Sequence, residues 1–333
     1  MLFLSKKDVI ASGVTDMSAA CEIIRRTLRL TADGGVRSAQ EVPLKLDGEV
    51  SDEAFYSLPA YVGGEFNKAG IKWTTHHPHN KEKGLPHIFT TLELNDPATG
   101  VPLALMEGSV ISAMRTGAVS AAAFTYLTNG EEKTLFCGGA GVQAEQQLNA
   151  ALYAIPSLQT VHIFSKTGVR AKALAGILSA KYPEKDISAV DSPSAAGISY
   201  DVLIGATNTA EPYLHAEDFK DGCLYCHIGF KDIDEQAVCG FDSYVLDDFE
   251  AGTSYSGQPL FCADRKGRFD RSKIFGLLNE FETGKKSLSR SPGKKIMFDG
   301  FGMVIFDIAL GCYVYEYAQK HGLGTEIDIL SDK

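Results

Sequence analysis

The chain has 333 residues, of which 44% are hydrophobic and 22% charged, and its formal net charge is −10. This length allows two domains with cores of their own, and the acidic balance argues against a general nucleic-acid binder, which needs a basic surface. No apolar run approaches the ~20 residues that cross a bilayer, and no basic segment precedes the apolar residues at the N-terminus. With an odd, scattered set of seven cysteines, we expect a cytoplasmic protein with reduced thiols.

The first hundred residues are predicted to form an α+β unit. Residues 5–33 have apolar positions at helical spacing, with Asp16 as a cap and Gly34 at the end. Strands are expected in VPLKL, SLPAYV and AGIKWTT, and HIFTTLELND should pair antiparallel with VPLALMEG across the turn NDPATG. The next segment, SVISAMRTGAVSAAAFTYLT, is predicted to be a helix whose small residues allow close packing.

The pattern then changes to short apolar strands separated by helical stretches. TLFC, TVHIFS, ISAVD, YDVLIGAT and GCLYCHIG follow one another in this way. Strands that alternate with helices predict βαβ units and a parallel sheet. Near the end of the chain, GMVIFDIALGCYVYEYAQKHG is predicted to be a long amphipathic helix.

The strongest local motif is the glycine turn CGGAGVQAE after the strand TLFC. Gly139-x-Gly141-x-x-Ala144 is close to the dinucleotide fingerprint: the first glycine allows the tight turn, the second lets the backbone approach a pyrophosphate, and the small third residue lets helix and strand pack. The phosphates would lie on N–H groups at the helix N-terminus, so we place Val142 and Gln143 in the cofactor site. The alternative is a turn with a purely structural role.

The end of the next strand indicates which cofactor is bound. NAD sites usually place an acid there to hold the ribose hydroxyls, but this chain has Ser165, Lys166 and Thr167, with Arg170 beyond. Hydroxyls and two cations suit a 2′-phosphate, so NADP(H) is preferred and NAD(H) stays possible. The alternative is that Lys166 and Arg170 are solvated charges at the start of a helix.

Thr207 and Asn208 are also expected in the cofactor site. They follow the strand YDVLIGAT, and ligands bind at the carboxyl ends of parallel strands. We therefore expect these two residues to contact the nicotinamide or its ribose.

Several motifs together resemble the ornithine cyclodeaminase/μ-crystallin family along nearly the whole chain. They are AGIKWTTHHPHN, LNDPATGVPLALMEGSVISAMRTGAVSA, GGAGVQAEQQ, ATNTAEP and GFGMVIFDIALG. The resemblance implies an α/β fold in which a Rossmann doubly wound parallel sheet, residues 115–302, is inserted into an α+β domain. That substrate-binding and dimerisation domain is built from both chain ends, residues 1–114 and 303–333. The resemblance also implies a homodimer and nicotinamide-dependent chemistry at the α-carbon of an amino acid.

The resemblance assigns roles to individual residues. Lys72 matches a lysine that serves in proton transfer, and Arg115 matches the arginine that binds the substrate carboxylate. Both roles suit the side chains, because the pKa of a buried lysine can be tuned and an arginine offers a planar fork to a carboxylate. Gly302 resembles the family's backbone contact to nicotinamide. Asp307 is expected either to help the active site or only to cap and pair, and without the family Lys72 and Arg115 could equally face solvent.

Two departures from the family bear on the reaction. Cyclodeaminases carry an acid in a Gly-Ala-Asp segment where this chain reads GFKD, with Asp232 one step away. This difference puts deamination with cyclisation in doubt. The segment is more similar to that of the branch that handles N-(amino-carboxyethyl)glutamate in diaminopropionate synthesis. The arginine that many members place near residue 41 is not evident. Lys45 or Arg37 is expected to replace it as a second carboxylate anchor, unless both face solvent.

The histidine-rich stretch IKWTTHHPHN raises the question of a metal site. No Cys/His pair has zinc-finger spacing, and His76 and His77 would point to opposite faces of a strand. We expect no metal, because hydride transfer is the work of the cofactor. His79 and Asn80 are expected to line the substrate pocket beside Lys72; the alternative is that they are polar groups of a loop.

The sequence therefore predicts an NADP(H)- or NAD(H)-dependent oxidoreductase that acts on the CH–NH bond of an α-amino acid or reduces an α-imino acid. One alternative is an ornithine-type cyclodeaminase, an ammonia lyase that recycles NAD internally. Another is a non-catalytic NADPH-binding protein like μ-crystallin. The expected partners are a small amino or imino acid and a second copy of the chain, with no nucleic acid and no membrane.

Overall fold

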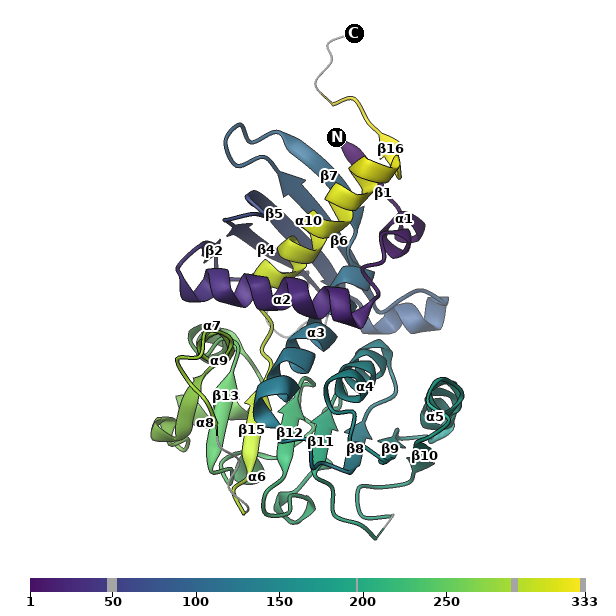
Figure 1. Ribbon diagram of the computed structural model, residues 1–333, viewed down its shortest axis with the longest axis vertical. Helices are drawn as coiled ribbons and strands as arrows, with labels where there is room; N and C mark the ends of the chain where they lie inside the picture. The colour runs from purple at the N-terminus through teal and green to yellow at the C-terminus, as the bar shows by residue number, and fades with distance from the viewer. Residues whose placement is uncertain (47–52, 196, 289–292, 330–333) are drawn as a thin grey trace. The chain divides into compact units, whose positions relative to one another are not determined.

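The computed structural model describes residues 1–46, 53–195, 197–288 and 293–329 (Figure 1). The chain divides into two compact units, one formed by Met1–Arg115 and Met303–Lys333 and the other by Thr116–Gly302. Within these ranges each unit is built on its own eight-stranded sheet. No helix of the described ranges is long and apolar enough to span a membrane.

The unit that contains both chain ends has a mainly antiparallel sheet in the order β16-β1-β7-β6-β5-β4-β2, with β3 paired to β4. β1 is parallel to β7. The elements are β1 (Leu2–Leu4), α1 (Lys6–Ala11), α2 (Met17–Ala32), β2 (Val36–Ser38), β3 (Val42–Lys45), β4 (Ala54–Val62), β5 (Lys68–His76), a 3₁₀ helix (Pro78–Lys83), β6 (Ile88–Asn95), β7 (Pro102–Glu107), the start of α3 (Ser109–Leu127), α10 (Val304–His321) and β16 (Thr325–Glu326).

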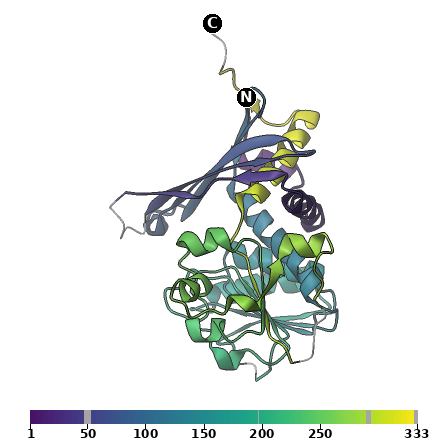
Figure 2. The ribbon, with the colours of Figure 1, turned by 90° about the vertical axis from the view of Figure 1, so that its left-hand side faces the viewer.

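Local signals explain several of these elements. Asp16 caps α2 by accepting the N–H of Ala19 at 2.8 Å, and β6 and β7 form the antiparallel pair expected across NDPATG. The helices α2 and α10 lie on the same side of the sheet, as Figure 2 shows. That face of the sheet, together with α2 and α10, forms the core of the unit.

The helix α10 corrects one expectation. The sequence predicts an amphipathic helix, but every residue from Val304 to Cys312 is buried. Glycines let this helix approach the sheet closely: a Cβ on Gly311 would lie 2.4 Å from Leu92 Cδ2, and one on Gly70 would lie 2.8 Å from Ile308 Cδ1. Because α10 is enclosed by its neighbours, its first turns have no polar face turned to water.

The second unit is a parallel sheet in the order β10-β9-β8-β11-β12-β15-β13-β14 (Figure 1). Its elements are β8 (Thr134–Gly138), α4 (Val142–Ala154), β9 (Thr160–Phe164), α5 (Val169–Lys181), β10 (Asp186–Val190), β11 (Val202–Gly205), β12 (Leu224–His227), α6 (Glu235–Val238), β13 (Ser243–Leu246), α7 (Glu250–Tyr255), α8 (Pro259–Arg265), β14 (Ile274–Leu277), α9 (Leu278–Glu282) and β15 (Ile296–Asp299), with short 3₁₀ turns at Ala216–Asp218 and Arg271–Lys273. The expected mixed α/β class with a parallel, Rossmann-like sheet is confirmed. In open parallel sheets of this kind, ligands bind at the edge where the strands end.

Candidate active site

Lys72 lies in β5, within a row of otherwise apolar side chains. Cross-strand pairing puts Leu58, Lys72, Leu92 and Met106 side by side, and residues directly opposite each other share one face of a sheet. This is the face that α10 covers, and Lys72 is only 6% exposed. A buried ammonium group in such a row needs a counter-charge.

Asp307, in the first turn of α10, supplies that counter-charge. Lys72 Nζ donates to Asp307 Oδ2 at 3.1 Å, and Arg115 Nε lies 3.2 Å from the same oxygen. Asp307 is 1% exposed, and the N-terminal end of a helix favours a carboxylate. Segments far apart in the sequence, β5, α3 and α10, therefore bring Lys72, Arg115 and Asp307 together; we call these three residues the Lys72 cluster.

The Lys72 cluster has groups that can titrate and groups that lack partners. Burial lowers the pKa of Lys72, and although Asp307 opposes this effect, the nearby charge of Arg115 adds to it. A lowered pKa lets a lysine exchange its proton closer to neutral pH. Arg115 Nε is within ion-pair distance of Asp307 Oδ2 but forms no hydrogen bond in the described part of the chain, and Asp307 Oδ1 is likewise buried there without a hydrogen-bond partner. The cluster can thus accommodate further polar contacts from a ligand.

A second acid, Glu41, lies near the same cations, immediately before β3. Burial raises the pKa of Glu41, while the charges of Lys72 and Arg115 act in the opposite direction. Burial also raises the pKa of Tyr56, with a contribution from the charge of Glu41. No sequence pattern predicts an acid here, because the family resemblance suggests a cation near residue 41.

Lys45 and Arg37 are not brought to the Lys72 cluster. Lys45 is exposed and pairs with Ala54, which pairs with His76. His76 is four positions along β5 from Lys72, roughly 13 Å at about 3.3 Å per residue. The exposed Arg37 donates from Nη1 to two neighbouring backbone carbonyls, each at 2.6 Å.

His79 and Asn80 belong to the 3₁₀ helix after β5. His79 is exposed, and its Nδ1 lies 3.4 Å from Glu82 Oε1. Asn80 Nδ2 donates to the carbonyl of Pro86 at 3.0 Å. Both contacts are local to the connection between β5 and β6.

The other histidines of this stretch contact one another or a nearby acid. His76 Nε2 lies 2.9 Å from His87 Nε2, and His77 Nδ1 lies 3.7 Å from Glu53 Oε2. In the ranges that the structure describes, no group of three or more His, Cys, Asp or Glu side chains could hold a metal ion.

In the second unit, the glycine turn has the shape that a dinucleotide site needs. Gly139 has φ +118°, and a Cβ there would lie 2.5 Å from the carbonyl oxygen of Ala206. Gly141 is the N-cap of α4, has no side-chain cap, and would place a Cβ in open space. Val142 is 65% exposed, and Gln143 Oε1 is buried without a hydrogen-bond partner among the described residues. Free N–H groups beside an open backbone fit a pyrophosphate.

The end of β9 carries the hydroxyls and cations expected near a ribose. Lys166, Thr167 and Arg170 are exposed. Ser165 has a local role as well, since its Oγ accepts the N–H of Ala171 at 3.1 Å and so caps α5. Lys166 and Arg170 are therefore accessible to a ligand, whereas the Ser165 hydroxyl already accepts a hydrogen bond within the chain.

Asp232 supports the loop that contains Thr207. Its Oδ1 accepts the Thr207 N–H at 3.0 Å, the Thr207 hydroxyl at 2.7 Å and the Tyr213 hydroxyl at 2.7 Å. Asp232 is fully buried, and burial raises its pKa. The next residue, Asn208, is exposed. Asp232 thus holds Thr207 in place, while Asn208 is free to face a ligand.

Asp247, which the sequence did not single out, fixes the backbone around Gly302. It accepts the N–H of Phe301 at 3.0 Å and that of Gly302 at 2.8 Å. Burial raises the pKa of Asp247 to about 7. Gly302 has φ +100°, a conformation that favours glycine. Since its N–H is engaged, a backbone contact from Gly302 to a cofactor would come from its carbonyl oxygen.

Comparison with known proteins gives one family along the chain. The model of the ornithine cyclodeaminase/mu-crystallin family matches residues 2–322. Among curated proteins, N-((2S)-2-amino-2-carboxyethyl)-L-glutamate dehydrogenase of Staphylococcus aureus is 24% identical over 99% of this chain and 98% of its own length.

Solved structures agree in fold over the whole length. Δ1-pyrroline-2-carboxylate reductase of Thermococcus litoralis, in complex with NADH and L-proline, has a TM-score of 0.89 and 29% identity, covering 98% of this chain and 100% of its own. An archaeal alanine dehydrogenase dimer with bound NAD has a TM-score of 0.88 and 27% identity, covering 99% of each chain.

Proposed function

Because the chain belongs to the ornithine cyclodeaminase/mu-crystallin family and is an NAD(P)-dependent oxidoreductase of amino or imino acids, we propose that it works mainly as an imine reductase with Lys72 as the proton-transfer group. The observation that carries this proposal is the buried Lys72 cluster, where Lys72 and Arg115 meet on one carboxylate oxygen of Asp307.

Arg115 is the proposed carboxylate anchor. Its Nε faces Asp307, so a substrate carboxylate would be held by the terminal nitrogens of the planar guanidinium. Asp307 fixes the orientation of that fork because it is itself buried and cannot move into water. The α-carbon of the substrate would then lie next to Lys72.

Lys72 is the proposed acid and base. An imine accepts hydride readily only when its nitrogen is protonated, and a lysine with a lowered pKa can supply that proton and take it back in the reverse reaction. Asp307 keeps the ammonium form accessible in a buried place and limits how far the pKa falls. Beside Asp307, Lys72 can therefore exist in both the protonated and the neutral form.

The cofactor site fits a nicotinamide dinucleotide. The open backbone at Gly141 and the uncapped start of α4 would hold the pyrophosphate, and Thr207, Asn208 and Gly302 are the proposed neighbours of the nicotinamide end. When bound, the cofactor supplies or accepts the hydride.

The test of this function is a turnover assay with both reduced cofactors. Cyclic imines, and 2-oxo acids mixed with ammonia or with primary amines, should consume NADPH or NADH when the purified protein is added. Ammonia release from ornithine without net change of the cofactor would instead favour the cyclodeaminase. Cofactor binding without any turnover would favour a non-catalytic protein and contradict the proposal.

We further propose that NADP(H) is preferred, because Lys166 and Arg170 are exposed where an acid would serve NAD. Changing both to alanine should weaken NADPH binding by about tenfold or more, as expected for lost hydrogen bonds to a charged group, and leave NADH binding nearly unchanged. Lys172→Ala, an exposed position further along α5, is the matched control. Equal weakening of both cofactors would contradict the preference.

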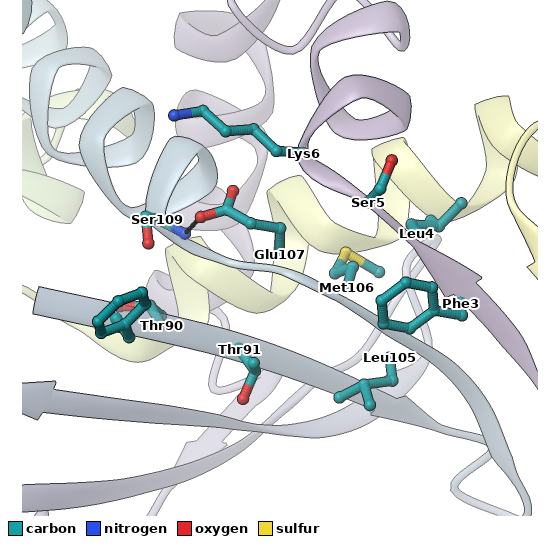
Figure 3. Close-up of a pocket in the computed structure, with 11 residues that line it drawn as sticks. Phe3, Leu4, Ser5, Lys6, Thr90, Thr91, Leu105, Met106, Glu107 and Ser109 are labelled. Atoms are coloured by element: carbon teal, nitrogen blue, oxygen red, sulfur yellow. Dashed lines mark hydrogen bonds between the residues drawn. The ribbon is translucent and has the colours of Figure 1, made fainter. Parts of the chain in front are cut away.

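A homodimer is proposed through the uncovered face of the sheet in the first unit. Phe3, Trp73 and Phe89 are exposed on this face. A cavity of about 350 Å³ opens there, with Phe3, Leu105 and Thr91 in its wall (Figure 3). Large exposed apolar patches mark interaction surfaces, and the alanine dehydrogenase relative is a dimer. A second copy of the chain is therefore the expected occupant.

A further inference from the structure

We infer that Glu41 selects the substrate: it binds a positively charged nitrogen on the side chain of the amino or imino acid and excludes a second carboxylate. The inference rests on the proposed function, because Glu41 lies near the Lys72 cluster. It adds a specificity that the family resemblance does not suggest, since the resemblance leads to a cation near residue 41.

A bulge in the sheet places Glu41. From Ser38 to Val42 the chain takes four steps, whereas their partners on β4, Ala60 and Ser57, are three steps apart. One extra residue therefore lies between β2 and β3. Bulges of this kind re-aim side chains and are common beside active sites.

The register brings Glu41 to the row of Lys72. Val42 pairs with Ser57, and extending that register by one residue places Glu41 opposite Leu58, which pairs with Lys72. Two strand spacings of about 4.8 Å separate the backbones of Glu41 and Lys72 by roughly 10 Å. A ligand the size of an amino acid can bridge such a gap, with its α-carboxylate at one end and its side chain at the other.

The charges of the site favour a cation at the Glu41 end. Asp307 already forms the ion pairs with Lys72 and Arg115, and in the described part of the chain the Glu41 carboxylate has no hydrogen-bond or ion-pair partner. A substrate α-carboxylate at Arg115 would neutralise one of the two cations whose charge now favours the ionised form of Glu41. The half-buried Glu41 would then need a new positive neighbour.

The electrostatic state of Glu41 agrees with this role. Burial raises its pKa, and only the charges of Lys72 and Arg115 oppose that effect. A bound ammonium group would favour the ionised carboxylate of Glu41 further. The ion pair between them would be stronger than in water, because the site is poorly hydrated. A second carboxylate at the same position would be repelled by Glu41 or would force it to take up a proton.

The experiment measures binding to the protein loaded with oxidised cofactor. Ornithine, norvaline and glutamate have side chains of similar length with positive, neutral and negative ends. By calorimetric titration, the unchanged protein should bind ornithine most tightly and glutamate most weakly. Glu41→Gln keeps the shape of the side chain and removes its charge. It should weaken ornithine binding by about tenfold or more, change norvaline binding by less than about threefold, and strengthen glutamate binding.

Glu93→Gln is the matched control. Glu93 pairs with Ile71, next to Lys72, and so lies on the opposite face of the same sheet; its substitution should leave all three affinities unchanged. Unaltered ornithine affinity in Glu41→Gln, tightest binding of glutamate, or no binding of ornithine to the unchanged protein would overturn the inference. Turnover measured in parallel judges the proposed function separately: binding in the expected order without turnover of any imine or amino acid contradicts the function but supports the role of Glu41.

Discussion

Replacing Lys72 with methionine is expected to lower kcat/KM by about 10²- to 10⁴-fold, the usual contribution of a positioned acid–base group. The folded state should survive, because methionine suits a row that already contains Leu58 and Leu92 and Arg115 still neutralises Asp307. Cofactor affinity, measured by fluorescence titration, should not change, since the proposed cofactor residues belong to the other unit. Steady-state turnover of the best imine substrate provides the rate.

Two further variants separate proton transfer from charge. Lys72→Arg keeps a cation beside Asp307, but an arginine does not release its proton in a protein, so this variant should also be slow. Lys68→Met changes a lysine of the same strand whose Nζ donates to the carbonyls of Phe66 and Asn67, and it should retain turnover. Full activity in Lys72→Arg would show that Lys72 acts by charge alone.

Gly141→Ala is expected to weaken dinucleotide binding by about 10- to 100-fold, or about 1.4–2.8 kcal/mol, with no loss of stability. The added methyl group meets no atom of the described residues within 4 Å, and the φ of Gly141 is −97°, which alanine adopts readily. It would, however, occupy the space through which a pyrophosphate approaches the backbone. Calorimetric titration with NADPH and NADH measures the effect, and urea unfolding tests the stability.

Gly176→Ala is the control for this variant. Gly176 lies exposed inside α5, and an added Cβ would meet no atom of the ranges that the structure describes, so alanine should stabilise the helix by up to ~1 kcal/mol without altering cofactor affinity. Gly139→Ala should instead lose stability as well as binding, because its Cβ would clash with the carbonyl of Ala206. If Gly141→Ala bound both dinucleotides normally, the turn would have only a structural role.

The parts of the fold that could be predicted were those with local signals. The cap Asp16, the small-residue helix α3, the β6–β7 pair and the glycine turn each depend on a few neighbouring residues. Three strands of the parallel sheet, β13, β14 and β15, were not predicted. Each has four residues, and the buried ones show no alternation that would separate a strand from a core helix. The full burial of α10 depends on its neighbours and could not be read from its own sequence.

The candidate site was predictable only where a motif marked a residue. Lys72 and Arg115 were found through the resemblance, whereas the partner that joins them, Asp307, was left open because it is 235 positions from Lys72. Glu41 was not found at all. Its approach to the cations depends on a bulge between two strands, and no local pattern in the sequence indicates where a sheet will gain one residue.

The pairing of the two chain ends has a consequence for biosynthesis. The strands that present Lys72 leave the ribosome early, but Asp307 and the helix that shields this row arrive about two hundred residues later, and β16 must still pair with β1. At a translation rate of ~5–20 residues per second, one apolar face of the sheet stays uncovered for on the order of 10–40 s. The continuous segment Thr116–Gly302 can fold during that interval. A prematurely terminated chain would keep the uncovered face and remain a target for chaperones and proteases, so Lys72 acquires its counter-ion only in chains translated through α10.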